Sequence, residues 1–475
     1  MVNGGVLDAL IIGAGISGAP LFDTLCQRGY RVGLVDQNDF SSGTSQASGM
    51  LIWGGLLYLQ HLDLATVLHL CKARRHLLEK AADHVAPLDF HYHPGAHGPA
   101  RKAFIWAGMQ LYWLLGGCEL MRPRWHRHGG ETTMRYQEAM LRNSDSRFVI
   151  DRITAHRPPD HTALNHCRVT AIRRDPSAGL WHLEMKDKIH GHEHTVRSKV
   201  LVNAAGVWAD EINHMAALDS PVKHVWSKGV YLAFPRGPDA AHVHPMDGRN
   251  DVLTHVSWGP VSMWGPTETL THDLNEGLSP NRDDVRFLLD HARKTLGGNH
   301  AAEDVISIRC GVRPLAVPRN FNRDVYPLTL SRKHRIVCHR GQMALSLYGG
   351  KFTSGIHQAT QAADMLSAWI PPTRPPSRPP KKPPEIATHD VLAHDFVTPE
   401  WARDHECCAT LDDYLRRRTN IAQWLPRMGL GRNNEHLESL EKSATVFAAD
   451  SPSAQHNLHA YENRVCSEYD PLLNL

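Results

Sequence analysis

The chain has 475 residues, of which 42% are hydrophobic and 21% are charged, and its formal net charge is +3. These values are typical of a globular protein with one or more large cores, and the small net charge argues against a nucleic-acid partner. The nine cysteines show no paired CxxC spacing, so we expect neither a disulfide framework nor a zinc ribbon. The first residues, MVNGGVLDALIIGAG, lack the features of a secretory signal. We therefore expect a cytoplasmic protein.

The first predicted elements form a strand, a glycine turn, a helix and a second strand. Residues 7–12 are a continuous apolar run, the pattern of residues 16–28 is helical, and residues 31–36 are again strand-like. The turn GAGISG carries Gly13, Gly15 and Gly18, and Asp36 ends the second strand. Glycines at this spacing let a helix N-terminus approach a pyrophosphate, and the acid suits a ribose hydroxyl pair. This pattern predicts dinucleotide binding; a glycine turn without a ligand is the weaker interpretation.

Two unusual stretches follow this unit. FSSGTSQASG at 40–49 is dense in hydroxyl groups and glycine, and its Ser42, Gly43, Thr44 and Ser48 suit the polar groups of a long cofactor. LIWGGLLYLQ at 51–60 places Gly54 and Gly55 inside an apolar run. Each glycine costs a regular element ~0.5–1 kcal/mol relative to alanine, so we expect another group to lie close to the backbone here.

Residues 101–127 form a predicted helix with basic and aromatic flanks. FIWAGMQLYWLLGGC at 104–118 contains no charged residue, yet it is shorter than the roughly 20 residues that span a bilayer. Arginine, lysine and tryptophan on both sides suit a membrane interface. A helix packed beneath a lid would show the same pattern, and the sequence does not decide between a helix at a membrane and a helix packed in this way.

The rest of the chain predicts an interleaved organisation. LVNAAGVWADEI at 201–212 repeats the strand, glycine and helix pattern around Gly206, and short β-like runs dominate 222–347. Proline-rich residues 371–387 predict an extended linker. Beyond it, Thr410 is a predicted helix N-cap, and Arg416–Arg418 are expected on a solvated or ion-paired face. We divide the chain into 1–370, with a substrate part mainly at 85–200 and 222–347, a linker at 371–387, and a helical domain at 388–475.

The stretch from Asp39 to Leu59 resembles the FAD-dependent glycerol-3-phosphate dehydrogenases, within the D-amino-acid oxidase superfamily. The similarity continues in order through most of the chain: SKGVYLAFPR (227–236), WGPTETL (264–270), RCGVRPL (309–315), LSRKH (330–334), YGGKFTS (348–354) and TLDDYLRRRTN (410–420). The resemblance implies an α/β fold in which a Rossmann-type FAD-binding domain is interleaved with an antiparallel β-sheet substrate domain, followed by a small C-terminal helical domain.

The resemblance also implies the cofactor and its contacts. The cofactor is FAD, and its expected contacts include Gly206, Gly350, Lys351 and Thr353 in addition to the positions named above. It further suggests that the flavin and the substrate on its face leave no room for side chains at Gly54 and Gly55.

The departures from the family are concentrated in the expected substrate pocket. The family's His-Gly-Gly-Leu-Arg-Tyr is Trp53-Gly54-Gly55-Leu56-Leu57-Tyr58 here, and its Lys-Gly-Ser-His is Lys228-Gly229-Val230-Tyr231. Arg313, Arg332, Lys351 and Thr353 are retained. Losing one charged hydrogen bond weakens phosphate binding roughly 10- to 150-fold. We therefore expect a polar or anionic substrate that differs from glycerol 3-phosphate.

Oxidation of a CH–OH carbon needs positive charge near the substrate oxygen and a base for its proton. We expect Arg332 and Lys351 to orient that oxygen and Arg313 to hold an anionic end. The base stays open between Lys351, Tyr231 and a bound water, with His357 a distant fourth.

Two other readings remain open. One is a true glycerol-3-phosphate dehydrogenase whose phosphate contacts come from Arg309 or Arg319. The other is a non-catalytic FAD-containing protein that binds a membrane or a partner.

The electron acceptor is either a quinone, which suits attachment through 101–127 at the inner face of the cytoplasmic membrane, or oxygen. No metal site is expected, because the histidines show no metal-ligand spacing. IHGHEH at 189–194 is interpreted as a solvated hairpin tip.

Overall fold

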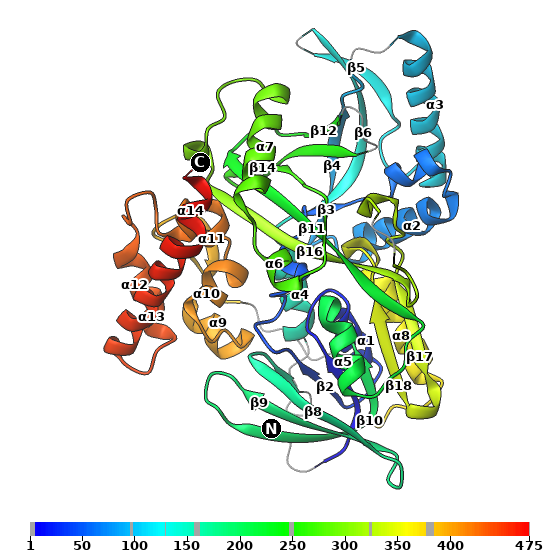
Figure 1. The fold of residues 1–475 in the computed structure, drawn as a ribbon, viewed down its shortest axis with the longest axis vertical. Helices are drawn as coiled ribbons and strands as arrows, with labels where there is room; N and C mark the ends of the chain where they lie inside the picture. The colour runs from blue at the N-terminus through cyan, green and yellow to red at the C-terminus, as the bar shows by residue number, and fades with distance from the viewer. Residues whose placement is uncertain are drawn as a thin grey trace.

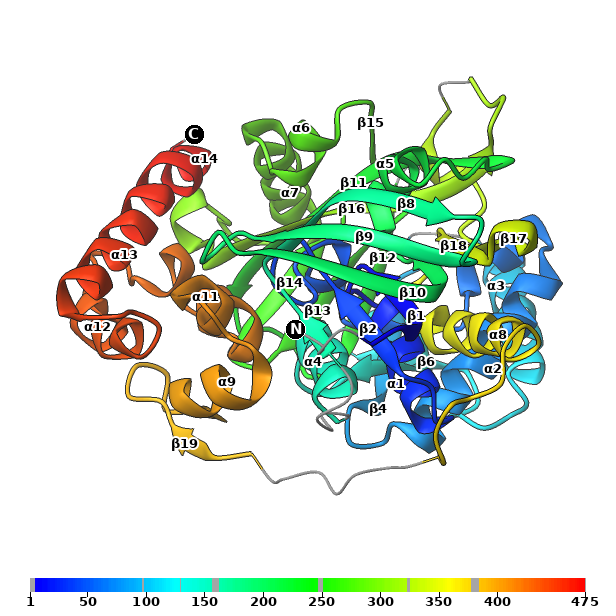
Figure 2. The same cartoon turned by 90° about the horizontal axis from the view of Figure 1, so that it is seen from below.

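The computed structural model describes residues 5–95, 98–128, 130–155, 162–246, 251–322, 325–376 and 384–474. Two sheets lie side by side in this part of the chain, and a group of helices near the C-terminus packs against one side of them (Figure 1). Figure 2 shows these last helices, α12 to α14, at the opposite end of the molecule from α2, α3 and α8.

The first sheet is built on the predicted βαβ unit. β1 (Leu7–Ile12) pairs in parallel with β2 (Val32–Val35) and with β10 (Glu193–Asn203), and all six residues of β1 are buried. Its main order is β17-β18-β10-β1-β2-β7. The other strands are β7 (Thr162–Leu164), β8 (Cys167–Asp175), β9 (Leu180–Asp187), β17 (Arg335–His339) and β18 (Ala344–Tyr348). The continuous apolar runs that predicted β1 and β2 therefore reflect burial on both faces.

Helices cover one face of this sheet. α1 (Gly18–Gln27) and α8 (Gly355–Ser367) pack together there, and α4 (Asp145–Thr154) joins them. Phe22 and Leu25 of α1 share a fully buried core with Ala359, Ala362 and Leu366 of α8. Small alanines on α8 let the two helices approach closely. α1 follows β1 and α8 follows β18 in the chain, so both helices begin near the ends of these strands.

The second sheet is mainly antiparallel and has ten strands, ordered β15-β11-β14-β13-β12-β4-β6-β3, with β16 beside β11 and β5 beside β6. Its long centre is the pair of β11 (Val222–Pro235) and β16 (Ser307–Pro318). The remaining strands are β3 (Leu51–Ile52), β4 (Val85–Tyr92), β5 (Arg124–His128), β6 (Glu131–Leu141), β12 (Ala241–Pro245), β13 (Val252–Trp258), β14 (Val261–Gly265) and β15 (Thr269–Thr271). Its helices are α2 (Leu64–Lys80), α3 (Pro99–Leu115), α6 (Leu274–Leu278) and α7 (Arg282–Thr295), and α5 (Ala209–Met215) follows β10.

The division between the two sheets differs from the expected substrate part, 85–200 and 222–347. Strands β7 to β10 and strands β17 and β18 lie in the sheet of β1. β18 pairs in parallel with β10, from which it is far removed in sequence. A short apolar run has a strand signal but carries no information about its partner, so sequence alone did not place these strands.

The C-terminal region is helical, apart from the small pair β19 (Ile386–Thr388) and β20 (Asp395–Val397). The Thr410 hydroxyl accepts a hydrogen bond from the Asp413 N–H, which confirms the predicted N-cap. The helices are α9 (Pro399–Glu406), α10 (Leu411–Asp413), α11 (Ile421–Trp424), α12 (Leu437–Val446), α13 (Ser451–Arg464) and α14 (Asp470–Leu473), and a π-helical turn, Tyr414–Arg418, follows α10. Residues 377–383 of the expected linker lie outside the described residues.

The arginines after α10 are ion-paired but not solvated. Arg417 and Arg418 are buried, and both donate to the buried carboxylate of Asp39, which follows β2. Burial alone would raise the pKa of Asp39, but Arg418 and Arg417 hold it well below its usual range. Of the two expected alternatives, the structure shows the ion-paired one for these two residues, because this region covers the loop that carries Asp39.

Candidate functional site

A cavity of about 340 Å³ lies where the two sheets meet. The first sheet contributes the residues that directly follow three parallel strands: Gly13 after β1, Ala204 after β10 and Gly349 after β18. The second sheet contributes Tyr231 of β11 and Arg313 of β16. Ligands of open α/β sheets bind outside the carboxyl ends of parallel strands, so this cavity is the candidate site.

The glycine turn forms one wall. Gly13 has φ +102°, and a Cβ there would lie 2.4 Å from the Ala204 carbonyl oxygen, so only glycine fits. The Ile16 N–H donates to Ser45 Oγ at 2.9 Å, and a Cβ on Gly15 would lie 2.8 Å from the same oxygen. α1 then begins without a side-chain cap and without an acid in its first turn. This helix N-terminus suits an anion.

Asp36 lies at the end of β2 and lines the cavity. Its carboxylate accepts hydrogen bonds from the Ala14 N–H at 2.8 Å and the Asn38 N–H at 3.0 Å. Burial raises the pKa of Asp36 to about 6, so the group is ionised at neutral pH. This position and charge suit a ribose hydroxyl pair.

The hydroxyl-rich loop also lines the cavity. Ser42, Gly43, Thr44 and Ser48 all face it, as the sequence predicted. Thr44 donates to the Val312 carbonyl at 2.5 Å, which ties the loop to β16 of the second sheet. A Cβ on Gly43 would lie 3.3 Å from the Trp208 ring, so this part of the wall is tightly packed.

Two arginines share one carboxylate in the cavity wall. Glu268 Oε2 lies 3.1 Å from Arg313 Nη1, and Glu268 Oε1 lies 2.8 Å from Arg332 Nη2. Burial alone would raise the pKa of Glu268, but Arg313 and Arg332 lower it. Within the described part of the chain, the buried Nε of Arg332 has no hydrogen-bond partner. The group therefore carries one net positive charge and an unused donor, which suits an anionic ligand.

Lys351 is the third cation in the site. Its Nζ lies 4.5 Å from the centroid of the Tyr58 ring. Burial, with a smaller effect of Arg332, lowers the pKa of Lys351 to about 7. A lysine with such a pKa can hold or release a proton near neutral pH.

Three side chains make the wall apolar or aromatic beside these charges. Trp53, Leu57 and Tyr231 line the cavity, and the Trp53 ring meets Phe90 edge-on with centroids 5.8 Å apart. The Tyr231 hydroxyl is close to the backbone, because a Cβ on Gly49 would lie 2.3 Å from it. Burial raises the pKa of Tyr231 above its ordinary value, so this hydroxyl is a poor base at neutral pH.

The structure corrects the explanation expected for Gly54. A Cβ there would lie 2.2 Å from the Tyr112 hydroxyl and 2.5 Å from Arg74 Nη1. Arg74 pairs with the buried Glu138, which also accepts the Gly54 N–H at 3.0 Å. Gly54 is therefore required by a buried protein ion pair behind the cavity wall, not by a flavin. Gly55 lines the cavity, with φ +89°.

Most of the predicted site residues come together here. Gly206, Gly350 and Thr353 also line the cavity. Gly18 does not: a Cβ there would lie 1.9 Å from the Gly13 carbonyl oxygen, so this glycine lets α1 pack on the turn.

Three other residues considered from the sequence also lie elsewhere. Arg309 is buried in an ion pair with Asp145 and donates to the Ser48 carbonyl at 2.8 Å. Arg319 pairs with Asp219 on the surface, and His357 stacks edge-on against His69. None of them is among the described residues that line the cavity, so a phosphate contact from Arg309 or Arg319 and a base at His357 do not fit this geometry.

Sequence reasoning missed three residues of the site. Glu268 and Tyr58 lie inside stretches that matched the family, yet nothing in their spacing marked them as partners of the cations. Ser45 lies inside the hydroxyl-rich loop and accepts the Ile16 N–H of the glycine turn. An isolated acid within a predicted β-run, as at Glu268, was the available signal, because such a group is rarely buried without a cation beside it.

The donors and acceptors of the cavity fit a flavin dinucleotide. The uncapped start of α1 offers backbone N–H groups to phosphates, and Asp36 offers a carboxylate to a ribose. The hydroxyl-rich loop supplies further polar contacts. The three cations and the apolar wall lie in the same cavity, so substrate and cofactor would share one enclosed space.

Comparison with known proteins agrees with this assignment. A family model described as "FAD dependent oxidoreductase" (DAO) matches residues 8–355. A glycerol-3-phosphate dehydrogenase of Pseudomonas aeruginosa is 30% identical over 366 residues, which are 74% of this chain and 69% of that protein. The mitochondrial glycerol-3-phosphate dehydrogenase of Arabidopsis thaliana is 28% identical over 402 residues, or 77% of this chain; the match spans only 62% of that protein.

Among solved structures, a glycerol-3-phosphate dehydrogenase from Bacillus halodurans complexed with FAD has the same fold. Its TM-score is 0.70 at 18% identity, and the match covers 99% of this chain and 96% of that one. The likeness therefore includes the C-terminal helices as well as the two sheets.

Proposed function

The chain belongs to the DAO family of FAD-dependent oxidoreductases, and from this premise we propose that it oxidises a CH–OH or CH–NH carbon of a polar or anionic small molecule other than glycerol 3-phosphate. FAD supplies the hydride acceptor when it is bound. Side chains of the cavity would bind the substrate, orient it and accept its proton.

The cations bind and orient the substrate. Arg313 and Arg332 hold its anionic or strongly polar end, and their shared partner Glu268 keeps both guanidinium groups in place. Lys351 Nζ takes the proton of the substrate hydroxyl, because the pKa of this amine is lowered to about 7. Burial in the cavity strengthens each of these contacts by excluding water.

The observation that carries a changed substrate is the apolar wall beside the arginines. Trp53 and Leu57 face the cavity where the resembled family has a histidine and an arginine. Placing a phosphate next to apolar groups leaves it partly desolvated without a partner. A substrate with a single anionic end and an apolar portion would contact the arginines with its anionic end and the apolar wall with its apolar portion.

The test is an anaerobic titration of the flavin-loaded protein with glycerol 3-phosphate, followed by its visible spectrum. We expect the flavin to stay oxidised at micromolar concentrations. A double variant, Trp53→His with Leu57→Arg, restores the side chains of the resembled family and should gain at least tenfold in apparent affinity. Bleaching of the unaltered protein at micromolar concentration would contradict the proposal. Hydroxy acids, amino acids and polar alcohols form the screen that follows.

The second candidate is a true glycerol-3-phosphate dehydrogenase. It is favoured by the convergence of Arg313, Arg332 and Lys351 in the cavity and by the names of the related proteins. In this case the three cations would have to bind the phosphate without Arg309 or Arg319. A third reading, a non-catalytic FAD-containing protein, would be supported if no alcohol or amine in the screen reduced the flavin.

We also propose that α3 rests on a membrane surface and that a quinone, rather than oxygen, accepts the electrons. Phe104 is 79% exposed and Leu114 is 58% exposed, and Leu62, which precedes α2, is 78% exposed. Exposed apolar groups gathered in this way, with basic residues beside them, suit a lipid headgroup region. In the described part of the chain no helix is long and apolar enough to cross a bilayer. We propose a cytoplasmic location, with α3 on the inner face of the cytoplasmic membrane.

A further inference from the structure

A second group of titratable side chains lies outside the cavity, on the second sheet. β4 and β12 pair in parallel, with His91 opposite His242, and β12 and β13 pair in antiparallel fashion, with His242 opposite His255. Side chains alternate along a strand, so His242 and His244 share one face while Ala241 and Val243 are buried on the other. Histidines of three neighbouring strands therefore gather on one face.

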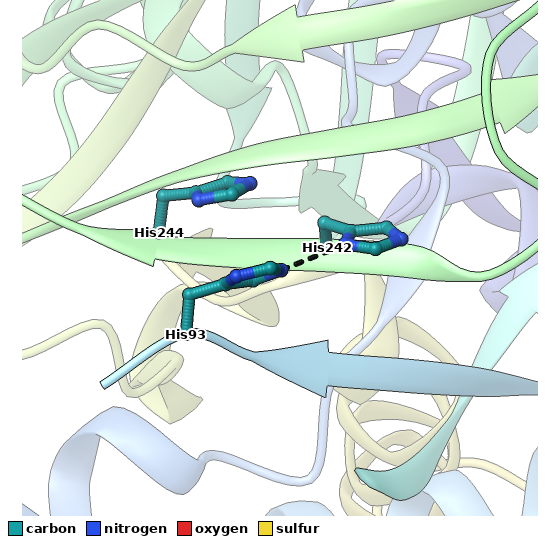
Figure 3. A group of neighbouring side chains, drawn as sticks. All are labelled: His93, His242 and His244. Atoms are coloured by element: carbon teal, nitrogen blue, oxygen red, sulfur yellow. Dashed lines mark hydrogen bonds between the residues drawn. The ribbon is translucent and has the colours of Figure 1, made fainter. Parts of the chain in front are cut away.

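Three histidines, His93, His242 and His244, lie together with their rings roughly stacked (Figure 3). His93 Nε2 and His242 Nδ1 are 2.7 Å apart, and the rings of His93 and His244 stack with centroids 4.2 Å apart. One ring nitrogen from each of the three lies within 4.8 Å of the other two. Rotation of the stacked rings about their side-chain torsions would direct one nitrogen of each toward a shared ion, at the ~2.0–2.1 Å that zinc–imidazole bonds require.

The backbone fixes two of these side chains relative to each other. His93 follows β4 directly, and its N–H donates to the Val243 carbonyl of β12 at 2.9 Å. His242 and His244 flank Val243 on β12. The pairing of β4 with β12 therefore sets where all three histidines attach to the sheet. The site is therefore built on strands, which position ligands more precisely than loops do.

One nitrogen of this group has no partner among the residues that the structure describes. His244 Nε2 is buried and has no hydrogen-bond partner in the described part of the chain. Without an ion, that nitrogen is desolvated and uncompensated.

A carboxylate orients one of the ligands. Glu131 Oε2 lies 3.3 Å from His93 Nδ1. A proton on Nδ1 directed at this carboxylate makes Nε2 the acceptor, and its lone pair then faces His242 Nδ1, whose proton an ion would replace. The same carboxylate–histidine arrangement supports metal ligands in many proteins.

We propose that His93, His242 and His244 bind one divalent transition-metal ion, with Zn²⁺ the best fit, and that this ion ties the end of β4 to β12. Imidazole ligands favour zinc over the hard cations calcium and magnesium, which prefer oxygen. The three histidines are not among the described residues that line the cofactor cavity, so the ion has no part in the oxidation. β4 leads on toward α3, and the ion would hold the strand that precedes this helix.

No metal site was expected from the sequence, because the histidines show no metal-ligand spacing along the chain. His93 and His242 are brought together only by the parallel pairing of β4 and β12, which sequence spacing does not reveal.

The test uses the untagged, flavin-loaded chain, freed of metal by a chelator and dialysed against buffered Zn²⁺. We expect about one Zn²⁺ per chain in the unaltered protein and at least tenfold weaker binding in His242→Gln and in His244→Gln. His190→Gln is the matched control, because this histidine is exposed in the turn between β9 and β10, and its binding should be unchanged. Equal loss in the control, or equal binding in all variants, would overturn the proposal.

A second measurement does not depend on the variants folding. X-ray absorption at the zinc edge of the unaltered protein should show three imidazole nitrogens around the ion. A first shell made of oxygen alone, or no retained zinc after dialysis, would also overturn the proposal. Flavin content and circular dichroism of each variant establish that it is folded.

Discussion

At Lys351, burial and the neighbouring Arg332 lower the pKa of the amine to about 7, so its proton state changes across the neutral range. Burial alone would lower the pKa of the Arg332 guanidinium, but Glu268 outweighs burial and raises it, so Arg332 stays charged throughout. The sequence identified both residues and Arg313 through the resemblance, but it did not pair them with the isolated acid Glu268, whose charge the two arginines share. Which side chains become partners depends on which strands lie side by side in the fold, and the sequence pattern does not contain this information.

The ionisation of Lys351 predicts a pH dependence. A base must be neutral to accept a proton, so kcat/KM for the best substrate should rise as the pH increases through about 7, the lowered pKa of Lys351, and should level off above it. Lys351→Met should remove this limb and lower the rate ~100-fold. Lys188→Met, which alters an exposed lysine, should leave the pH limb and the rate unchanged. A pH limb that persists in Lys351→Met would assign the proton to another group.

The reassignment of Gly54 gives a prediction about stability. A methyl group there collides with Tyr112 and Arg74, so Gly54→Ala should lower the free energy of unfolding by ~1–3 kcal/mol. Denaturant unfolding measures this change. Gly341→Ala is the control, because a Cβ at Gly341 meets nothing within 4 Å. Unchanged stability together with weaker flavin binding would restore the earlier explanation, in which the flavin occupies the space.

Among the elements, those with strong local signals were predicted well. β1, α1 and β2 were expected from their periodicity and glycine turn, and the structure confirms all three. β17 and β18 were expected in the second sheet and lie in the first. The difference is physical: local sequence determines whether a segment is a strand, whereas tertiary packing determines which strand lies beside it.

The exposed face of α3 predicts membrane binding that depends on individual apolar residues. Each buried Phe or Leu side chain contributes ~1.5–3 kcal/mol on transfer from water, and partial insertion retains a fraction of this. The double variant Phe104→Ser with Leu114→Ser should therefore bind anionic vesicles at least ~10-fold more weakly in a flotation assay. Met365→Ser on α8 alters a residue that is only 38% exposed and should have no effect. Equal binding of all three proteins would remove α3 as the contact.

At the scale of the whole molecule, the C-terminal helices are joined to the cofactor-binding sheet by buried charges. Arg418 donates to both oxygens of Asp39, at 2.7 and 2.9 Å, and Arg417 donates to Asp39 and to Gln46 of the hydroxyl-rich loop. The helical region was predicted from composition and resemblance. Its attachment was not, because a run of three arginines looks the same whether it faces water or a buried carboxylate.

This attachment predicts a large effect of one substitution. Asp39→Asn leaves two buried guanidinium groups without their shared anion and should lower the free energy of unfolding by ~3–5 kcal/mol. Asp364→Asn is the matched control, because it breaks an ion pair in which the Asp364 side chain is 62% exposed, and such pairs contribute ~0–1 kcal/mol. A similar loss in the two variants would contradict the role of the buried network.

The same network predicts how stability depends on pH. The pKa of Asp39 in the folded protein lies below its ordinary value of 3.8, because Arg418 and Arg417 offset the cost of burial. Its contribution is therefore complete above that value and is lost as the pH falls toward the lowered one. Acid unfolding monitored by circular dichroism should show a steeper loss for the unaltered chain than for Asp39→Asn. Parallel curves would exclude Asp39 as the group responsible.

The pairing of Asp39 with Arg417 and Arg418 also has a consequence for biosynthesis. Asp39 precedes its two counter-charges by 378 and 379 positions, so a chain made only as far as residue 416 holds this carboxylate without either arginine. Because burying the unpaired carboxylate would be costly, the adjoining hydroxyl-rich loop is expected not to fold until the arginines are present. We therefore expect the flavin to bind only after Arg417 and Arg418 have been made.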